Sequence, residues 1–367
     1  SHDASLAVFE TKRRGLGPNR SKTELLWASL SKDFSGVPND PHLNKSQVAQ
    51  AIGHYGKPNK VVWYERPLLK TLRQWRAGQG WLYKENNIRS YLERWNINVP
   101  ITYTQHHLSH AAYAYYTQPH DDCAVVCLDS IGEFETLTVW HGKNNKLKKL
   151  YSQGYPHSLG LFYSAMTQRL GLVPNRDEYL VSQMASKGNY KIYSKRIMNE
   201  LLEVCANEPY IKCRENFHRG CMWWAPELNS VQDYADIAAG TQAVYERIFR
   251  HYCNYIRTHT ASENLVVMGG CALNCVANSI AKEYFREVWI MPNPGDAGSS
   301  LGTILAAKNK FVHFNNPYLG YNISGAYPVQ SALKELRNFI KDRITITFAH
   351  KWTTEVSALH EMLKDIS

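Results

Sequence analysis

Short, continuous apolar runs recur along the chain, and several of them end at a glycine or an acidic residue. Three runs show this pattern: Cys123–Leu128 before Asp129, Leu265–Met268 before Gly269, and Val288–Met291 before a proline–glycine turn. Apolar runs of this length predict strands that are buried on both faces of a sheet. Such strands, when they lead through tight turns into helices, are typical of α/β proteins, which bind ligands at the carboxyl ends of their strands.

Segments with helical periodicity lie between and after these strands. Apolar residues recur at helical spacing in four of them: residues 67–95, 158–170, 231–258 and 301–308. Another helix is predicted to begin near His106, and residues 1–10 predict an N-terminal strand. Residues 11–60 are basic and interrupted by glycine and proline, which favours loops and short helices there.

Length and composition are those of a folded globular protein. The chain has 367 residues, more than one hydrophobic core usually organises, so two lobes are expected. No apolar run is long enough to span a membrane, and Ser1–Asp3 does not resemble a signal peptide. Eight cysteines are too few for a dense disulfide framework and predict reduced thiols. We therefore expect a cytoplasmic protein with no membrane partner.

The net charge of +10 and the pI of about 9.1 favour polyanions, nucleotides or phosphorylated substrates as partners. Residues 57–95 interleave basic and aromatic side chains, a composition that suits nucleic acid through phosphate contacts and stacking. A basic amphipathic helix that packs its tryptophans inward would have the same composition, so both interpretations stay open. The sequence leaves the oligomeric state open as well.

Two histidines four residues apart, His106 and His110, share one face of the predicted helix. Neutral imidazoles at this spacing suit a metal, with Asp296 as a distant carboxylate ligand and positions left for water or substrate. A helical zinc protease does not fit, because no glutamate follows the first histidine to act as base. Taken alone, the two histidines would equally fit the solvated start of a helix.

Two glycine segments are candidates for nucleotide binding. Gly269 and Gly270 follow a buried strand and allow close approach of a ligand, and Asn274 can hydrogen-bond a base or ribose. Packing of a helix on a strand requires glycine too, so this signal is weak. The segment around Gly298 can bind phosphate at a helix N-terminus. Asp296 in that segment would repel phosphate unless a cation lay between them, which favours a metal.

An acidic turn lies between two predicted strands, Cys123–Leu128 and Leu137–Trp140. Asp129, Gly132 and Glu133 can position Mg²⁺ or water beside phosphates, although an ordinary hairpin is the alternative. His2 and Asp3 are hypothesised to face the same cleft. The catalytic candidates are therefore His2, Asp3 and Asp129.

As a set, these segments resemble the O-carbamoyltransferase family that includes the tobramycin and nodulation-factor carbamoyltransferases. The matching segments occur in family order: His2–Ser5, Trp63–Lys70, His106–Ala112, Asp129–Glu133, Asp177–Tyr179, Gly269–Asn278 and Pro294–Gly302. By the family pattern, His106, His110 and Asp296 would hold Fe²⁺ or another divalent transition metal. Asp129 and Gly132 would lie near the phosphates, and Gly269, Gly270 and Asn274 would hold the adenylate.

The resemblance also implies a two-lobed actin-like ATPase fold, similar to that of the tRNA threonylcarbamoyl-transferring enzymes. The N-terminal domain would span residues 1–312, with lobes at about 1–185 and 230–312. Residues 313–367 would be a linker and the start of a second, adenylate-forming α/β domain that is incomplete here. The signature of that domain is absent, so the adenylate would be made by the rest of a longer chain or by another polypeptide.

The resemblance predicts an ATP-dependent O-carbamoyltransferase. Carbamoyl phosphate and ATP, with Mg²⁺, would give carbamoyl adenylate, and the carbamoyl group would pass to an acceptor hydroxyl. The basic charge makes a hydroxymethylated nucleic-acid base such as one in DNA the first candidate, and a sugar or antibiotic-like hydroxyl the alternative. Two other classes stay open: an actin-like sugar kinase and a non-catalytic nucleic-acid-binding module. Two departures weaken the match, namely Ser130 where the family has glycine and a shortened segment after Glu10.

Overall fold

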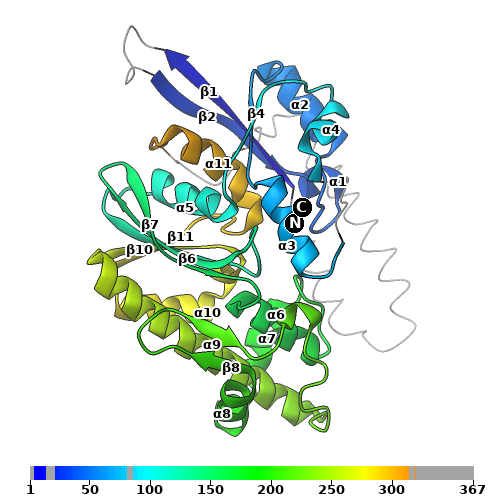
Figure 1. Ribbon diagram of the computed structural model, residues 1–367, viewed down its shortest axis with the longest axis vertical. Coiled ribbons are helices and arrows are strands. Elements are labelled where there is room, and N and C mark those ends of the chain that lie inside the picture. Colours follow the sequence, from blue (N-terminus) through cyan, green and yellow to red (C-terminus); the bar gives the residue numbers. More distant parts are fainter. Residues whose placement is uncertain (1–3, 14–20, 81–85, 314–318, 320–367) are drawn as a thin grey trace, which may run out of the picture. The chain divides into compact units, whose positions relative to one another are not determined.

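The structure is a computed structural model that describes residues 4–13, 21–80, 86–313 and 319 (Figure 1). These residues belong to one compact unit, which ends at Leu319. Helices and a mixed sheet make up this unit, which confirms the predicted α/β class. His2, Asp3 and most of residues 313–367, the predicted linker and start of a second domain, lie outside the described residues.

A five-stranded sheet forms the centre of the molecule. Its order is β11 (Glu287–Ile290), β10 (Asn264–Met268), β5 (Cys123–Leu128), β6 (Glu135–Lys143) and β7 (Lys146–Gly154). Strand β10 runs parallel to both β5 and β11, whereas β6 and β7 are antiparallel to their neighbours. The carboxyl ends of the three parallel strands therefore lie at one edge of the sheet. The sheet joins strands from both ranges expected as lobes, and the division into lobes stays a prediction.

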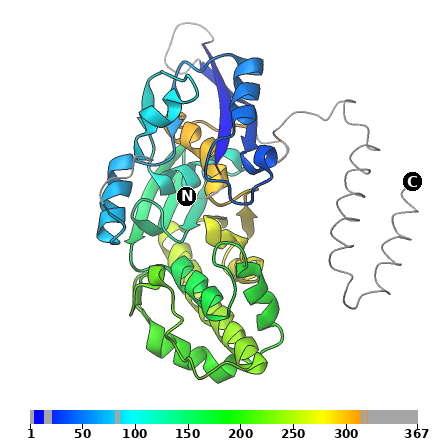
Figure 2. The same ribbon diagram turned by 90° about the vertical axis from the view of Figure 1, so that its right-hand side faces the viewer.

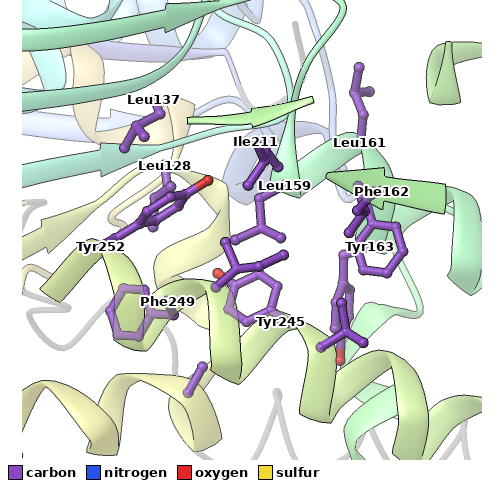
Figure 3. Packing of buried hydrophobic residues seen from close by; sticks show 14 of the residues in the cluster. Leu128, Leu137, Leu159, Leu161, Phe162, Tyr163, Ile211, Tyr245, Phe249 and Tyr252 are labelled. Atoms are coloured by element: carbon purple, nitrogen blue, oxygen red, sulfur yellow. The ribbon is translucent and has the colours of Figure 1, made fainter. Parts of the chain in front are cut away.

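Every residue of β5 is buried, because helices cover both faces of the sheet. Cys123, Val125 and Cys127 pack with α5 (His106–Thr117) and α11 (Ser299–Lys308) on one face. The alternate residues of β5, which point to the other face, pack with α6 (Leu159–Arg169) and α9 (Val231–Thr260). Figure 3 shows this second cluster, in which Leu128 of the sheet faces the aromatic side chains of α9. The continuous apolar run of β5 thus has its predicted cause. The same prediction is wrong for β11, an outer strand of the sheet, in which Trp289 and Ile290 are exposed.

The N-terminal part of the chain lies on the α5 and α11 side of the sheet (Figures 1 and 2). Its elements are β1 (Ser5–Arg13), β2 (Ser21–Leu30), α1 (Lys32–Ser35), α2 (Lys45–Tyr55), β3 (Val61–Trp63), α3 (Pro67–Arg76), α4 (Ile88–Glu93) and β4 (Ile101–Tyr103). Strands β1 and β2 form an antiparallel pair, and β3 pairs in parallel with β4. The remaining elements lie beyond the sheet: α7 (Glu178–Ala185), α8 (Tyr190–Leu201), β8 (Leu202–Val204), β9 (Ile211–Cys213) and α10 (Cys275–Asn278).

Two of the expectations for the N-terminal part are wrong. Loops and short helices were expected over residues 11–60, but residues 21–30 form β2, because Trp27 is buried and Leu25 packs against the core. The helical segment 67–95 is divided into α3 and α4, since Gly78 and Gly80 follow α3 with positive φ angles of 77° and 100°. Helix α3 has no buried residue, so its tryptophan does not pack inward.

None of the eight cysteines forms a disulfide bond. None of the helices in the described ranges combines the length and the apolar character needed to cross a membrane.

Close packing of α11 on α5 depends on a glycine. A Cβ atom at Gly302 of α11 would lie 1.7 Å from the backbone oxygen of Ser109 in α5, and it would also meet Tyr113. Because backbone cannot yield as a flexible side chain can, α11 approaches α5 this closely only with glycine at position 302. The contact positions the N-terminus of α11, and the turn before it, against the first turns of α5.

We predict that Gly302→Ala destabilises the protein by about 1–3 kcal/mol, because the added methyl group overpacks the α5–α11 contact. Gly53→Ala is the matched control, since Gly53 lies within α2 and a methyl group added there would have nothing within 4 Å. That change is expected to stabilise by about 0.5–1 kcal/mol, the usual difference between alanine and glycine within a helix. Denaturant unfolding measures both, and equal effects at the two positions would contradict the packing account.

Candidate metal centre

The first two turns of α5 place two imidazoles on one buried face. His106 is the first residue of the helix and His110 lies one turn later, and both side chains are buried. The alanine and tyrosine residues that follow are buried as well, so α5 is held between the sheet and α11. The alternative of a solvated, histidine-rich helix start is therefore wrong.

Two carboxylates reach the same place from the edge of the sheet. Asp129 directly follows β5, and Asp296 begins a short 3-10 turn (Asp296–Gly298) that leads into α11. The Oδ1 atom of Asp129 accepts a hydrogen bond from the backbone N–H of Ser130 at 2.8 Å, which leaves Oδ2 toward the imidazoles. The sheet edge thus brings together two acids that are 167 positions apart in the chain (296 minus 129).

The four side chains converge closely. The Nε2 atoms of His106 and His110 lie 3.1 Å apart. His106 Nε2 is 3.1 Å from Asp129 Oδ2 and 3.2 Å from Asp296 Oδ1, and His110 Nε2 is 3.6 Å from each of the same two oxygens. All four atoms fall within 4.8 Å of one another. The structure therefore brings together the three predicted metal ligands and adds Asp129 to them.

Burial favours the neutral form of each of these groups, but their mutual attraction outweighs it. For His106, burial opposes protonation, whereas the Asp296 and Asp129 carboxylates raise its pKa well above the usual value. For Asp129 and Asp296, burial favours the protonated acid, yet His106 and His110 hold the pKa of each carboxyl well below its usual range. Two ionised carboxylates in one buried space require positive charge between them.

A divalent metal fits this donor set. Two imidazole nitrogens and one or two carboxylate oxygens are ligands of iron, zinc and related transition metals, and two histidines with one carboxylate leave open positions in non-haem iron sites. Without a metal ion, the positive charge would have to come from protonated imidazoles, which would then be charged in a buried space. The residues present therefore fit a transition metal, as predicted from their spacing.

The acidic turn after Asp129 has structural partners. Glu133 is buried and accepts hydrogen bonds from the backbone and side chain of Arg66, with which it forms an ion pair at 2.9 Å. A Cβ atom on Gly132 would lie 2.9–3.0 Å from the rings of His107 and His106. Glycine at 132 thus makes room for the imidazoles, and its predicted contact with phosphate stays a prediction.

Packing also accounts for two further glycines. At Gly269 the φ angle is +90°, and a Cβ atom there would lie 2.0 Å from the backbone oxygen of Leu128. At Gly298 a Cβ atom would meet the Asn293 carbonyl and the Tyr113 ring. Protein atoms alone require glycine at both positions, so their predicted roles in nucleotide binding stay predictions.

A pocket of about 240 Å³ opens beside the centre on the α6 and α7 side. Its wall includes Asp129, Tyr163, Tyr179, Gly270 and Asn274. Asn274 accepts from the Ala277 N–H as the cap of α10, and its amide exchanges hydrogen bonds of 3.1–3.2 Å with that of Gln242. Of the predicted nucleotide residues, Gly270 and Asn274 line this pocket together with Asp129.

Sequence reasoning named Asp129 as a catalytic candidate but did not place it beside the histidines, and it did not assign Tyr163 or Tyr179 to the site. Tyr163 is buried, and its hydroxyl hydrogen-bonds Gln242 at 2.9 Å, whereas Tyr179 is 60% exposed and free to contact a ligand. A usable signal existed for Asp129, because the neighbouring parallel strands β5 and β10 end at the same edge. Tyr179 lies in the matching segment Asp177–Tyr179, and no comparable signal marks Tyr163.

Fold and site together define an α/β protein with a buried centre of two histidines and two aspartates at the carboxyl edge of its parallel strands. The family described as carbamoyltransferase N-terminus matches residues 64–305, about two thirds of the chain. The chain belongs to this family. The predicted resemblance to carbamoyltransferases is confirmed.

The chain is similar to several individual proteins. A protein of Synechocystis is 30% identical over 293 residues, which cover 69% of this chain and 48% of the relative. Nodulation protein NolO of Bradyrhizobium diazoefficiens is 27% identical over 210 residues, or 56% of this chain and 38% of that protein. The crystal structure of T. kodakarensis HypF aligns with a TM-score of 0.40 and 15% identity, covering 61% of this chain and 39% of HypF. The chain spans about half the length of the curated relatives it matches.

We predict that the purified protein contains a divalent transition metal and that His110→Ala lowers its metal content at least about tenfold, because a direct ligand is lost. His141→Ala is the matched control: His141 Nε2 also pairs with an aspartate, Asp122, at 2.9 Å, but away from the centre. Elemental analysis of both variants measures the effect. Equal metal content in the two variants would refute the assignment.

Proposed function

We propose that the chain transfers a carbamoyl group from carbamoyl adenylate to an acceptor hydroxyl at the His106–His110–Asp296 centre. The observation that carries the proposal is the convergence of these three side chains and Asp129 in a chain of the carbamoyltransferase family. In this reaction the acceptor oxygen forms a bond to the carbamoyl carbon. The bond from that carbon to the AMP phosphate oxygen breaks, AMP leaves with its electron pair, and the hydroxyl proton passes to a base.

His106, His110 and Asp296 would hold Fe²⁺ or another divalent transition metal. Such an ion, when bound, polarises a carbonyl and stabilises the charge that develops on its oxygen. Asp129 would act as the base. Its Oδ1 is held by the Ser130 N–H, its Oδ2 lies at the centre, and its side chain also lines the neighbouring pocket. This carboxylate therefore stands between the centre and the space proposed for the adenylate.

The pocket lined by Asp129, Gly270 and Asn274 would receive the adenylate. The exposed ring of Tyr179 offers a stacking surface for a base. Arg176 lies on the same wall, where its guanidinium forms an ion pair with Asp177 at 2.7 Å, and it would exchange this partner for a phosphate. A polar cleft of about 530 Å³ reaches both Asp129 and Asp296 and carries Arg73 and Arg219, together with Lys70, which forms an ion pair with Glu65. These cations suit the approach of an anionic adenylate.

Formation of the adenylate from carbamoyl phosphate and ATP, with Mg²⁺, would take place outside the described residues. The curated relatives are about twice as long as the matched segment, and the remaining half of such a protein, or a separate polypeptide, would supply the adenylate-forming domain. In the same proposal the described unit is the N-terminal part of a two-lobed actin-like fold. The free thiols suit a cytoplasmic, reducing compartment.

For the acceptor, we propose a hydroxymethylated base of a nucleic acid such as DNA. Its support is the net charge of +10 and the cations around the polar cleft. A sugar or antibiotic-like hydroxyl is the alternative, because nodulation proteins are among the relatives. Family membership favours carbamoyl transfer over the activity of a sugar kinase, which would transfer phosphate and leave the carbamoyl group untouched.

Two carboxylate variants separate the base from the metal ligands. We expect Asp129→Asn to retain most of the metal but to lower kcat for carbamoyl transfer at least about 100-fold, because general-base catalysis is lost. Asp296→Asn should lose both metal and activity. Mass spectrometry of the acceptor, for one added carbamoyl group, and elemental analysis measure the two effects. An Asp129→Asn protein with full activity would remove Asp129 from the reaction.

Salt separates the two acceptor classes. If DNA is the acceptor, its phosphates release counterions on binding, and kcat/KM should fall at least about tenfold between roughly 50 and 200 mM salt. A free, uncharged sugar or nucleoside alcohol should show little change over the same range. Transfer that responds weakly to salt on every acceptor would argue against a polynucleotide.

A further inference from the structure

A second cavity reaches the centre from another side. It has a volume of about 440 Å³, within the range of small-molecule sites, and its wall includes Asp296. The pocket proposed for the adenylate contacts the centre through Asp129 instead. The two cavities thus meet the same group of side chains through different carboxylates, as the two substrates of a transfer reaction require.

Polar atoms without partners lie in the wall of this second cavity. Ser299 and Thr303 of α11 are 1% and 2% exposed, and the Oγ of Ser299 and the Oγ1 of Thr303 have no hydrogen-bond partner among the described residues. The indole N–H of Trp63 is buried and lacks a partner there as well. Native proteins pair nearly all such groups, so three unpaired groups around one cavity point to a ligand that supplies hydrogen bonds.

Aromatic rings lie in the wall as well. Trp63 lies 5.8 Å from Tyr64 and 5.9 Å from Tyr91, between ring centroids, and the Tyr91 hydroxyl accepts a hydrogen bond from the Leu43 N–H. All four residues line the cavity. A wall that combines aromatic rings with hydroxyl groups suits a ligand that has a flat apolar face and polar groups on its edge.

Most charges in the wall of the cavity are paired. Glu65 is buried and forms an ion pair with Lys70, and both residues lie in the wall. Asp296 is compensated by the imidazoles of the centre. Arg94 is the remaining charged group of the wall, and its guanidinium lies 5.9 Å from the centroid of the Tyr91 ring. The cavity thus carries one cation without an acidic partner among the described residues, which leaves room for an uncharged ligand.

Only part of the wall falls within the range matched by the family. The match starts at residue 64, so His42, Leu43 and Trp63 lie outside it, whereas Asp296, Ser299 and Thr303 lie inside it. Tyr64, Tyr91 and the residues next to the centre thus lie at family positions, whereas Trp63 and the segments before it precede the matched range.

We propose that this cavity binds the acceptor as one uncharged ring that bears the reacting hydroxyl, stacked on Trp63 and hydrogen-bonded by Ser299 and Thr303. The inference rests on the proposed carbamoyl transfer and names its acceptor site. A free sugar ring and a hydroxymethylated base share this chemistry. A base in a duplex would reach the recessed cavity only after flipping out of the stack.

Binding can be measured without turnover. We would record saturation-transfer NMR on the full-length protein with methyl glucoside, hydroxymethylated deoxycytidine and a duplex carrying that base. At least one probe should bind, and Trp63→Ala should raise its Kd about tenfold, as expected for loss of one stacking partner. Trp223→Ala is the matched control, because Trp223 is 53% exposed and lies outside the walls of the three cavities described above.

Ser300→Leu provides a second variant in case Trp63→Ala fails to fold. Ser300 is partly exposed in the cavity wall, and leucine there should fill the space and weaken binding of the same probe. Binding of the glucoside alone identifies a sugar source, and binding of the nucleoside or duplex identifies a nucleic-acid source; either supports the site. Absence of binding by all three probes, or Kd values that neither cavity variant changes, would overturn it.

Carbamoyl transfer is assayed separately, with carbamoyl adenylate supplied directly as the donor to the bound probe. A probe that binds through Trp63 but never receives a carbamoyl group would refute the proposed function and leave the ring-binding site in place. Transfer that proceeds with an unchanged acceptor KM in both cavity variants would refute the site and leave the function in place.

Discussion

Two carboxylates and two imidazoles share one buried space, and this arrangement is the constraint on which the rest of the account depends. Burial alone would favour the neutral form of each group, yet the distances of 3.1–3.6 Å between them keep the acids ionised. The positive charge must come from protons on the imidazoles or from an ion, and the donor set is one that transition metals accept. Apolar side chains could fill the same space without the cost of burying charges, so the two carboxylates are not there for stability.

The sheet and two helices create this space. Strands β5 and β10 run parallel side by side, so the residue after β5 lies at the same edge as the turn that carries Asp296. The first turns of helix α5 carry the two histidines to that edge. Gly302 allows α11 to pack closely against α5. Three cavities then open around the centre, one reaching Asp129, one reaching Asp296 and one reaching both. A reaction that joins two substrates at one centre needs this kind of access.

The sequence was most informative where the spacing of residues along the chain matched the period of a helix or strand. The buried runs predicted β5 and β10, and the four-residue spacing placed His106 and His110 on one face. Pairing between β1 and β2 could not be predicted, because the segment is rich in charged residues and its inward positions are few. The glycines were interpreted as signs of nucleotide binding, but packing alone accounts for two of them. Gly269 is required by its contact with Leu128, and Gly298 by its contacts with Asn293 and Tyr113. Only the fold reveals these contacts. The acceptor cavity combines residues from five separate segments, so no local sequence pattern predicts it.

Anomalous X-ray scattering from a crystal of the purified protein, recorded on both sides of the iron absorption edge and of the edges of neighbouring metals, tests the central claim most directly. The account predicts one anomalous peak within bonding distance of His106 Nε2, His110 Nε2 and an oxygen of Asp296. A centre that shows no peak at any transition-metal edge, with the imidazoles hydrogen-bonded directly to the two carboxylates, would contradict it.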